Sequence, residues 1–230
     1  MDWIALDKQL LLALNGSDSL FLDSLVKTLT TATTWIPLYI ALLYLVVKNC
    51  NNIKEVLLIL GCAILCVVLA GSIDDTLVKP LVARWRPARD PEIGMTVDIV
   101  NGYRGGRFGF FSAHASNTFS IAIFFALLIR SRLLSVTMII WSLLNCWTRM
   151  YLGVHYPGDI LVGLLWGGVV GALVWLLYSR AEKRTGQSGS FISTHYTKTG
   201  YQHEHINVVV CVFLFTIIYA IIKACFSLYI

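Results

Sequence analysis

The segment "RMYLGVHYPGD", residues 149–159, places an arginine, a histidine and an aspartate within an otherwise apolar part of the chain. Tyr156-Pro157 is typical of a helix start, with proline at the first helical position. His155 then precedes the helix, and Asp159 lies four residues on, within reach across its opening turn. A carboxylate there can bind one imidazole N–H, fix the tautomer and leave the other nitrogen free to attack. The spacing predicts a nucleophilic histidine with an orienting acid.

Three fixed cations could surround the group that this histidine attacks. Lys79 and Arg86 follow one apolar block of the chain, and Arg149 ends another. Guanidinium and ammonium groups at such boundaries suit a multiply charged anion such as phosphate. The pattern favours all three as phosphate ligands.

A second histidine opens a further apolar block, in the segment "FSAH" at 111–114. Ser112 is a typical N-cap residue, so the amides from Ala113 onward would point free N–H groups at the same anion. His114 would then lie in the first helical turn, where it can protonate a leaving group.

The elements that must position these residues are transmembrane helices. The 230-residue chain is 57% hydrophobic and 13% charged, with a mean hydropathy of +0.72, whereas soluble domains carry about twice that charged fraction. Asp, Glu, Lys and Arg are absent from six long blocks, each roughly 23–30 Å long as a helix and close to the ~30 Å hydrocarbon thickness. The blocks are Thr28–Val47, Val56–Ile73, Ala115–Ile129, Leu133–Thr148, Ile160–Tyr178 and Ile206–Ile222. They lack the two-residue alternation of a β-barrel, so we predict an all-α polytopic transmembrane bundle of about six spans.

The charge distribution predicts which side each linker faces. The linkers "KNCNNIKE", "RSR" and 179–205 hold eight basic residues and three acids, and six spans place all three on one side, which the positive-inside rule makes cytoplasmic. Both termini and all three chemical clusters would then share the outer side. We therefore predict an integral membrane protein whose site faces outward, away from the cytoplasm.

The chain divides into one catalytic core with additions at each end. Residues 1–25 begin with "MDWIALDKQLLLALN", whose acids and missing cleavage site favour a retained amphipathic helix on the membrane surface over a signal peptide. Residues 26–178 form the predicted core, 179–205 a polar cytoplasmic linker and 206–230 a last transmembrane helix. A short N-terminal span remains the alternative for the first segment.

The outer linker at 79–111 is long and contains Lys-Pro, Arg-Pro and Asp-Pro steps before a glycine-rich run. Proline after Lys79 and Arg86 disfavours helical geometry at both, so we expect the chain to bend there. Loops of this length in compact proteins are usually functional or disordered, and the aromatic residues at its end favour function.

A nucleophile with its acid, a proton donor and surrounding cations suffice for phosphoryl transfer to water through a phosphohistidine. We expect no metal and no other cofactor, because no cluster offers several carboxylates arranged for a divalent ion. Asp74-Asp75 is the nearest candidate, but capping or pairing with neighbouring cations is favoured. The pair Cys62 and Cys66 is interpreted as buried apolar side chains, and the histidines of the 179–205 linker as solvated residues.

In order and spacing these residues resemble the type 2 phosphatidic acid phosphatase (PAP2) superfamily of membrane lipid-phosphate phosphatases. The family has three signatures. In the first, six residues separate a lysine from an Arg-Pro pair, and the second is Pro-Ser-Gly-His. In the third, Ser-Arg is followed by five residues, a histidine, three more residues and an aspartate. Here they read "KPLVARWRP" at 79–87, "FSAH" at 111–114 and "TRMYLGVHYPGD" at 148–159, within a resemblance covering about residues 55–178. Phe111, Ala113 and Thr148 replace the family's proline, glycine and serine, which bears on backbone geometry more than on activity.

The resemblance implies a role for each matched residue. His155 would be the nucleophile, Asp159 its partner and His114 the general acid. The phosphate ligands would be Lys79, Arg86, Ser112, Ala113 through its amide, and Arg149. Arg84, Arg89, Arg104 and Arg107 match no signature; each is a possible substrate contact, against headgroup binding or pairing with an acid.

The expected activity is hydrolysis of a terminal phosphate from a lipid phosphate or diphosphate. The Arg- and Gly-rich stretch 102–109 favours a bulky glycolipid such as lipid A phosphate, or undecaprenyl diphosphate. Phosphatidylglycerophosphate or phosphatidic acid is the alternative substrate, and a transporter or inactive lipid-binding relative is the alternative class. The resemblance implies a protein of the bacterial inner membrane, so that the outward-facing site would face the periplasm. The expected partners are this lipid and the bilayer, with no nucleic acid, and the sequence gives no indication of oligomeric state.

Overall fold

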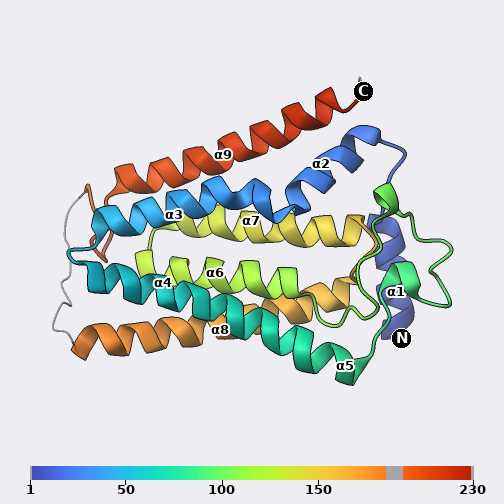
Figure 1. Cartoon of the computed structure of the whole chain (residues 1–230), viewed down its shortest axis with the longest axis horizontal. Coiled ribbons are helices and arrows are strands. Elements are labelled where there is room, and N and C mark those ends of the chain that lie inside the picture. Colours follow the sequence, from blue (N-terminus) through green and yellow to red (C-terminus); the bar gives the residue numbers. More distant parts are fainter. Residues whose placement is uncertain (1, 185–193, 229–230) are drawn as a thin grey trace.

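The computed structural model describes residues 2–184 and 194–228, and its long helices run side by side along one axis (Figure 1). Both ends of the chain lie at the same end of this bundle, where α1 crosses it (Figure 1). The helices are α1 (Trp3–Leu14), α2 (Leu20–Thr30), α3 (Ile36–Asn49), α4 (Ile53–Val67), α5 (Lys79–Val82), α6 (Ala113–Ile129), α7 (Arg132–Tyr151), α8 (Pro157–Arg184) and α9 (His203–Phe226).

The helices confirm the predicted all-α transmembrane bundle. Within the described residues, five helical segments are long and apolar enough to cross a membrane: Ala32–Asn49, Ile53–Val82, Arg132–Tyr151, Pro157–Glu182 and His203–Phe226. The apolar helix α6 is shorter, with 17 residues, and packs between α7 and α8. Together these segments correspond to the six predicted blocks.

The first predicted block is not one continuous helix, which corrects that prediction. α2 ends at Thr30, and a 3₁₀ turn over Ala32–Trp35 precedes α3. The Trp35 indole donates to the Leu29 carbonyl and the Thr34 hydroxyl to the Thr28 carbonyl, so side chains satisfy groups that the helix would otherwise bond. Pro37, which lacks an N–H, is the second residue of α3, where a helix amide has no partner within the helix.

The expected bend at Lys79 is also absent, whereas Arg86 is extended as predicted (φ −69°, ψ 150°). Helical geometry continues from α4 through two π-helical turns, Val68–Ser72 and Asp74–Val78, into α5. The Lys79 amide donates to the carbonyl of Asp74, five residues back. The wider turn separates the proline ring from the preceding carbonyls, and so accommodates Pro80.

A seam of small residues brings α6 and α8 into close contact. A Cβ atom added at Gly163, Gly167 or Gly171 of α8 would lie 2.8, 2.4 or 2.5 Å from the carbonyl oxygens of Ser112, Ser116 and Ser120, respectively. Glycines four residues apart thus allow the two backbones to touch, as in other membrane helix pairs. This contact fixes the start of α6 beside the start of α8.

The terminal segments differ in their limits from the predicted ones. Residues 1–25 contain α1 and the beginning of α2 instead of one helix, because Asn15 and Gly16, the latter at φ +61°, lie outside helical geometry between them. α8 extends six residues past the predicted boundary, to Arg184, and α9 begins at His203. Much of the predicted linker, 185–193, lies outside the described residues.

The linkers that were predicted to share one side meet at the end of the bundle opposite α1. The Gln202 amide donates to Asn49 Oδ1, which joins the 194–202 segment to the α3–α4 connection. The Thr199 hydroxyl donates to the Ile129 carbonyl at the end of α6. The three basic linkers therefore adjoin one another, as six spans require.

Candidate active site

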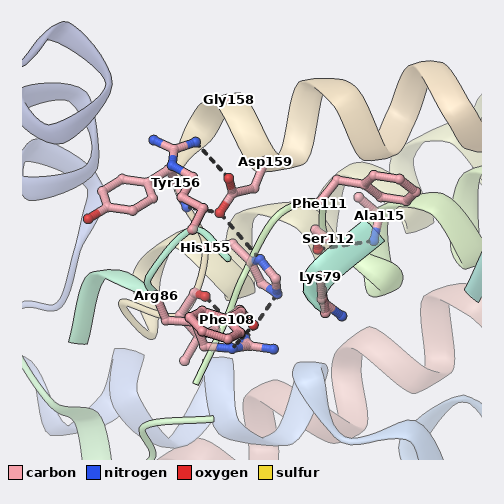
Figure 2. Close-up of polar contacts among 12 residues, drawn as sticks. Lys79, Arg86, Phe108, Phe111, Ser112, Ala115, His155, Tyr156, Gly158 and Asp159 are labelled. Atoms are coloured by element: carbon pink, nitrogen blue, oxygen red, sulfur yellow. Dashed lines mark hydrogen bonds and ion pairs between the residues drawn. The ribbon is translucent and has the colours of Figure 1, made fainter. Parts of the chain in front are cut away.

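His155 and Asp159 lie together at the start of α8, as the spacing predicts (Figure 2). His155 Nδ1 is 3.6 Å from Asp159 Oδ2, and the two side chains are 2% and 0% exposed. The same carboxylate oxygen accepts a hydrogen bond of 3.0 Å from the Tyr156 amide. Asp159 therefore both closes the first turn of α8 and faces the imidazole.

Arg86 fixes the tautomer of His155. Its Nη1 is 3.1 Å from His155 Nε2 and 3.1 Å from the Val154 carbonyl, and its Nε donates to the Phe108 carbonyl at 3.0 Å (Figure 2). An arginine can only donate, so Nε2 must carry a lone pair and the ring proton must be on Nδ1, facing Asp159. The lone pair of the candidate nucleophile thus points toward the cations.

The surroundings of His155 disfavour its charged form. Burial, followed by the positive charges of Arg86, Arg149 and Lys79, lowers the pKa of His155 well below the ordinary value of 6.5. The imidazole is therefore neutral at physiological pH, which is the form a nucleophile needs.

The start of α6 adjoins this pair. Ser112 is the N-cap, as predicted: its hydroxyl accepts from the Ala115 amide at 3.4 Å, and its own amide donates to the Asp159 carbonyl at 3.1 Å. Ala113 and His114 form the first turn, where helix amides have no partner within the helix. His114 is half-buried and lies two residues after Ser112, the residue whose amide joins α6 to Asp159.

Arg149 is held from two sides near the end of α7. Its Nη1 donates to the Thr30 hydroxyl at 2.7 Å, where α2 ends, and its Nη2 to the Tyr103 hydroxyl at 3.1 Å. The side chain is 3% exposed, and its buried Nε has no hydrogen-bond partner among the described residues. No local sequence pattern predicts Thr30 or Tyr103 as a partner of Arg149, because both come from distant segments.

Asp74 links the lysine to the second signature. Lys79 Nζ lies 2.8 Å from Asp74 Oδ2 and also pairs with Asp75, which bears out pairing as the favoured interpretation of these acids. Asp74 Oδ1 accepts from the Phe111 amide at 3.0 Å. Proline, the family residue at 111, could not donate this bond, so the departure at Phe111 has a structural reason.

Arg84 joins the catalytic pair to α1. Its Nη1 donates to Asp159 Oδ1 at 2.7 Å and its Nη2 to Asp7 Oδ2 at 2.6 Å. Its guanidinium carbon lies 4.2 Å from the centre of the Tyr156 ring. Arg84 is therefore paired with two acids, the alternative to a substrate contact.

The other unmatched arginines lie on the outer loop. Arg107 covers the rings of Trp85 and Phe108, at 4.7 and 5.1 Å from their centres. Arg89 donates to the Gly105 carbonyl at 3.4 Å, and Arg104 is exposed. Their contact with substrate stays a prediction.

A resident metal ion would need a cluster of ligand side chains within residues 2–184 and 194–228, the part of the chain that the structure describes. No group of three or more His, Cys, Asp or Glu side chains in these ranges could hold a metal ion. The side chains gathered at the candidate site are of the types that transfer protons or bind anions. The expectation of a metal-free reaction stays a prediction.

Residues 55–183 match the model of the PAP2 superfamily. The chain belongs to this superfamily. It is 42% identical over 79% of its length, and 80% of the relative's, to a "Lipid A 4'-phosphatase" of Bacteroides thetaiotaomicron. A protein of the same name from Porphyromonas gingivalis is 34% identical over 79% of this chain and 76% of its own. A "Lipid A 1-phosphatase" of Rhizobium etli is 26% identical over 60% of this chain and 59% of its own.

No solved structure matches the chain. The PAP2 match and the relatives nevertheless confirm the predicted family and the prediction of a membrane phosphatase. The three PAP2 signatures meet at one end of the bundle, so segments far apart in the chain form one site.

Proposed function

We propose that this PAP2 protein hydrolyses the 4′-phosphate of lipid A through a phosphohistidine. The observation that carries the chemistry is the buried His155, with Asp159 on one nitrogen and Arg86 on the other. The relatives that cover most of the chain are named for the 4′-phosphate of lipid A, which supports this substrate. Exposed arginines on the adjoining outer loop suit a bulky, anionic glycolipid.

Substrate binding would reorganise the cations around the phosphate. Arg86 transfers its hydrogen bond from Nε2 to a phosphate oxygen, which frees the lone pair. The unpartnered Nε–H of Arg149, the third donor of Lys79, and the amides after Ser112 bind the remaining oxygens. These groups stabilise the charge that spreads over the oxygens in the transition state.

The reaction then proceeds in two displacements. His155 Nε2 forms a bond to phosphorus while the bond to the sugar oxygen breaks. His114, which takes up a proton when the phosphate dianion binds beside it, gives that proton to the leaving oxygen. The ring keeps its Nδ1 proton and becomes cationic, which Asp159 stabilises. Water next attacks phosphorus and gives a proton to His114, the P–N bond breaks, and phosphate leaves with both histidines restored.

We also propose that the site opens at the periplasmic face of the inner membrane. The catalytic end of the bundle lies opposite the linkers rich in lysine and arginine. By the positive-inside rule those linkers are cytoplasmic. The lipid tails would then stay in the outer leaflet while the headgroup enters the site.

The substrate proposal is tested with the purified protein and a set of lipid phosphates. We expect phosphate release from lipid A that carries only the 4′-phosphate, and little release from lipid A that carries only the 1-phosphate. The difference follows because a site that places one sugar phosphate against His155 discriminates by position. Faster hydrolysis of undecaprenyl diphosphate or phosphatidylglycerophosphate would contradict the proposed substrate while leaving the mechanism intact.

The acid side of the pH profile tests the electrostatics of His155. Because its pKa lies well below 6.5, the ring stays unprotonated and nucleophilic as the pH falls through 6.5. We expect kcat/KM, which reports the free enzyme, to hold its plateau there after correction for the phosphate's own ionisation near pH 6. A loss of activity centred on pH 6.5 that is independent of the substrate would contradict this assignment.

A further inference from the structure

Arg84 lies between two carboxylates from segments that are far apart in the chain. Asp159 of α8 accepts its Nη1–H and Asp7 of α1 accepts its Nη2–H. Asp7 also accepts from the Gly158 amide at 2.8 Å, in the first turn of α8. The N-terminal helix therefore contacts the catalytic turn through one arginine and one amide.

The buried Asp159 depends on this arrangement for its charge. Its carboxylate is 0% exposed, and an ionised carboxylate in that position must be paired and hydrogen-bonded. Its Oδ2 faces His155 and the Tyr156 amide, so Arg84 is the cation on Oδ1. Arg84 cannot release its proton, so it supplies a permanent charge there.

The position of Arg84 is itself fixed on three sides. Asp7 and Asp159 hold its two terminal nitrogens, and the Tyr156 ring lies beneath its plane. The Tyr156 hydroxyl donates to Asp90 Oδ2 at 2.7 Å, so that ring is anchored as well. A guanidinium held in this way fixes the direction of the carboxylate as well as its charge.

We propose that Arg84, held by Asp7 of α1, is a positioning residue that keeps the Asp159 carboxylate ionised and aimed at His155. The inference rests on the proposed role of His155 as nucleophile. It gives α1 a role in catalysis, because Asp7 of α1 supplies the second of the two carboxylates that hold Arg84. Arg84 acts through Asp159 and does not touch the phosphate.

The test replaces Arg84 by alanine in the full-length protein. We expect kcat to fall by about 100-fold, the loss that a misplaced catalytic group produces, while KM stays close to the wild-type value. The Arg84 side chain is 25% exposed, so free guanidinium can reach the vacated position. Added guanidinium should restore part of kcat in Arg84→Ala, whereas sodium at equal ionic strength should not.

Further variants separate this role from general stabilisation of the fold. Asp7→Asn should lower kcat less than Arg84→Ala, because Arg84 still pairs with Asp159. Glu92→Gln is the matched control, since it removes an ion pair between α1 and the outer loop that does not involve Asp159. It should keep wild-type activity.

The outcomes that overturn the inference differ from those that overturn the proposed function. Wild-type kcat in Arg84→Ala, beside an inactive His155→Ala, would refute the positioning role alone. A loss in Arg84→Ala that guanidinium does not restore, in protein that purifies like the wild type, would refute it as well. Activity in His155→Ala would instead remove the proposed function on which the inference depends.

Discussion

Replacing His155 by alanine is expected to lower phosphate release by about 10⁴-fold or more, the scale seen when a nucleophile or its base is removed. The ring is the group whose lone pair faces the cations; Arg86 fixes its tautomer, and Asp159 faces the other ring nitrogen. Without it, water would have to attack the ester directly in a site that lacks a general base at that position. The measurement is phosphate release from 4′-phosphorylated lipid A.

Two further samples separate lost chemistry from lost folding in this experiment. His155→Asn keeps a polar side chain of smaller volume at the buried position and should be equally inactive. His203→Ala removes an exposed histidine at the opposite end of the bundle and should retain full activity. Turnover near the wild-type rate in either His155 variant would refute the phosphohistidine mechanism.

Replacing His114 by asparagine is expected to affect the two displacements differently, depending on the leaving group of the substrate. For a lipid phosphate the leaving oxygen needs a proton, so we expect a loss of about 10²- to 10⁴-fold, the range of general acid–base catalysis. For p-nitrophenyl phosphate the leaving group is already a stable anion, so the first displacement should stay fast. The second still needs a base for water, so one equivalent of nitrophenol per enzyme should appear in a burst.

A second measurement detects the phosphorylated intermediate that should accumulate in this variant. Phosphate should remain on His155 in His114→Asn, as an acid-labile and base-stable label that the double variant with His155→Ala lacks. Equal losses on both esters and no burst would contradict the assignment of His114 as acid and base. A label on any other residue would contradict the assignment of His155.

The sequence alone brought the candidate site residues together at one end of the bundle because membrane helices constrain their positions so strongly. Charged side chains at the ends of apolar spans are costly, so their presence there indicates a function. Because successive spans alternate in direction, every second linker lies on the same side of the membrane. The clusters at Lys79, Ser112 and His155 could therefore be assigned to one end before any coordinates. Helix starts at Ser112 and Pro157 followed from local capping chemistry and are found where predicted.

The breaks inside apolar segments could not be predicted from composition. Hydropathy identifies a span, but it does not show that Trp35 and Thr34 bond back to carbonyls and end α2 at Thr30. That break has a consequence for the site, because it places the Thr30 hydroxyl against Arg149. The π-helical turns before Lys79 likewise depend on packing that a single sequence does not reveal.

Contacts between distant segments were the other group that sequence reasoning missed. Asp7 was interpreted only as an acid on a surface helix. Arg84 was interpreted as a possible substrate contact, with headgroup binding or pairing with an unspecified acid as the alternatives. Their pairing requires α1 to lie across the end of the bundle, which no local pattern specifies (Figure 1). Tyr103 is a similar case, since its hydroxyl meets Arg149 across 46 residues of chain.

The glycine seam between α6 and α8 also determines the geometry of the reaction. Gly167 lies eight residues beyond Asp159, about two helical turns into the hydrocarbon, where its hydrogen faces the Ser116 carbonyl. One added methyl group at that depth would push the two helices apart and widen the gap between acid and nucleophile at the rim. Packing inside the membrane-spanning part of the protein would therefore set the distance between two side chains at its surface, and a bulkier residue at any of these three glycines is expected to slow the reaction without touching the site.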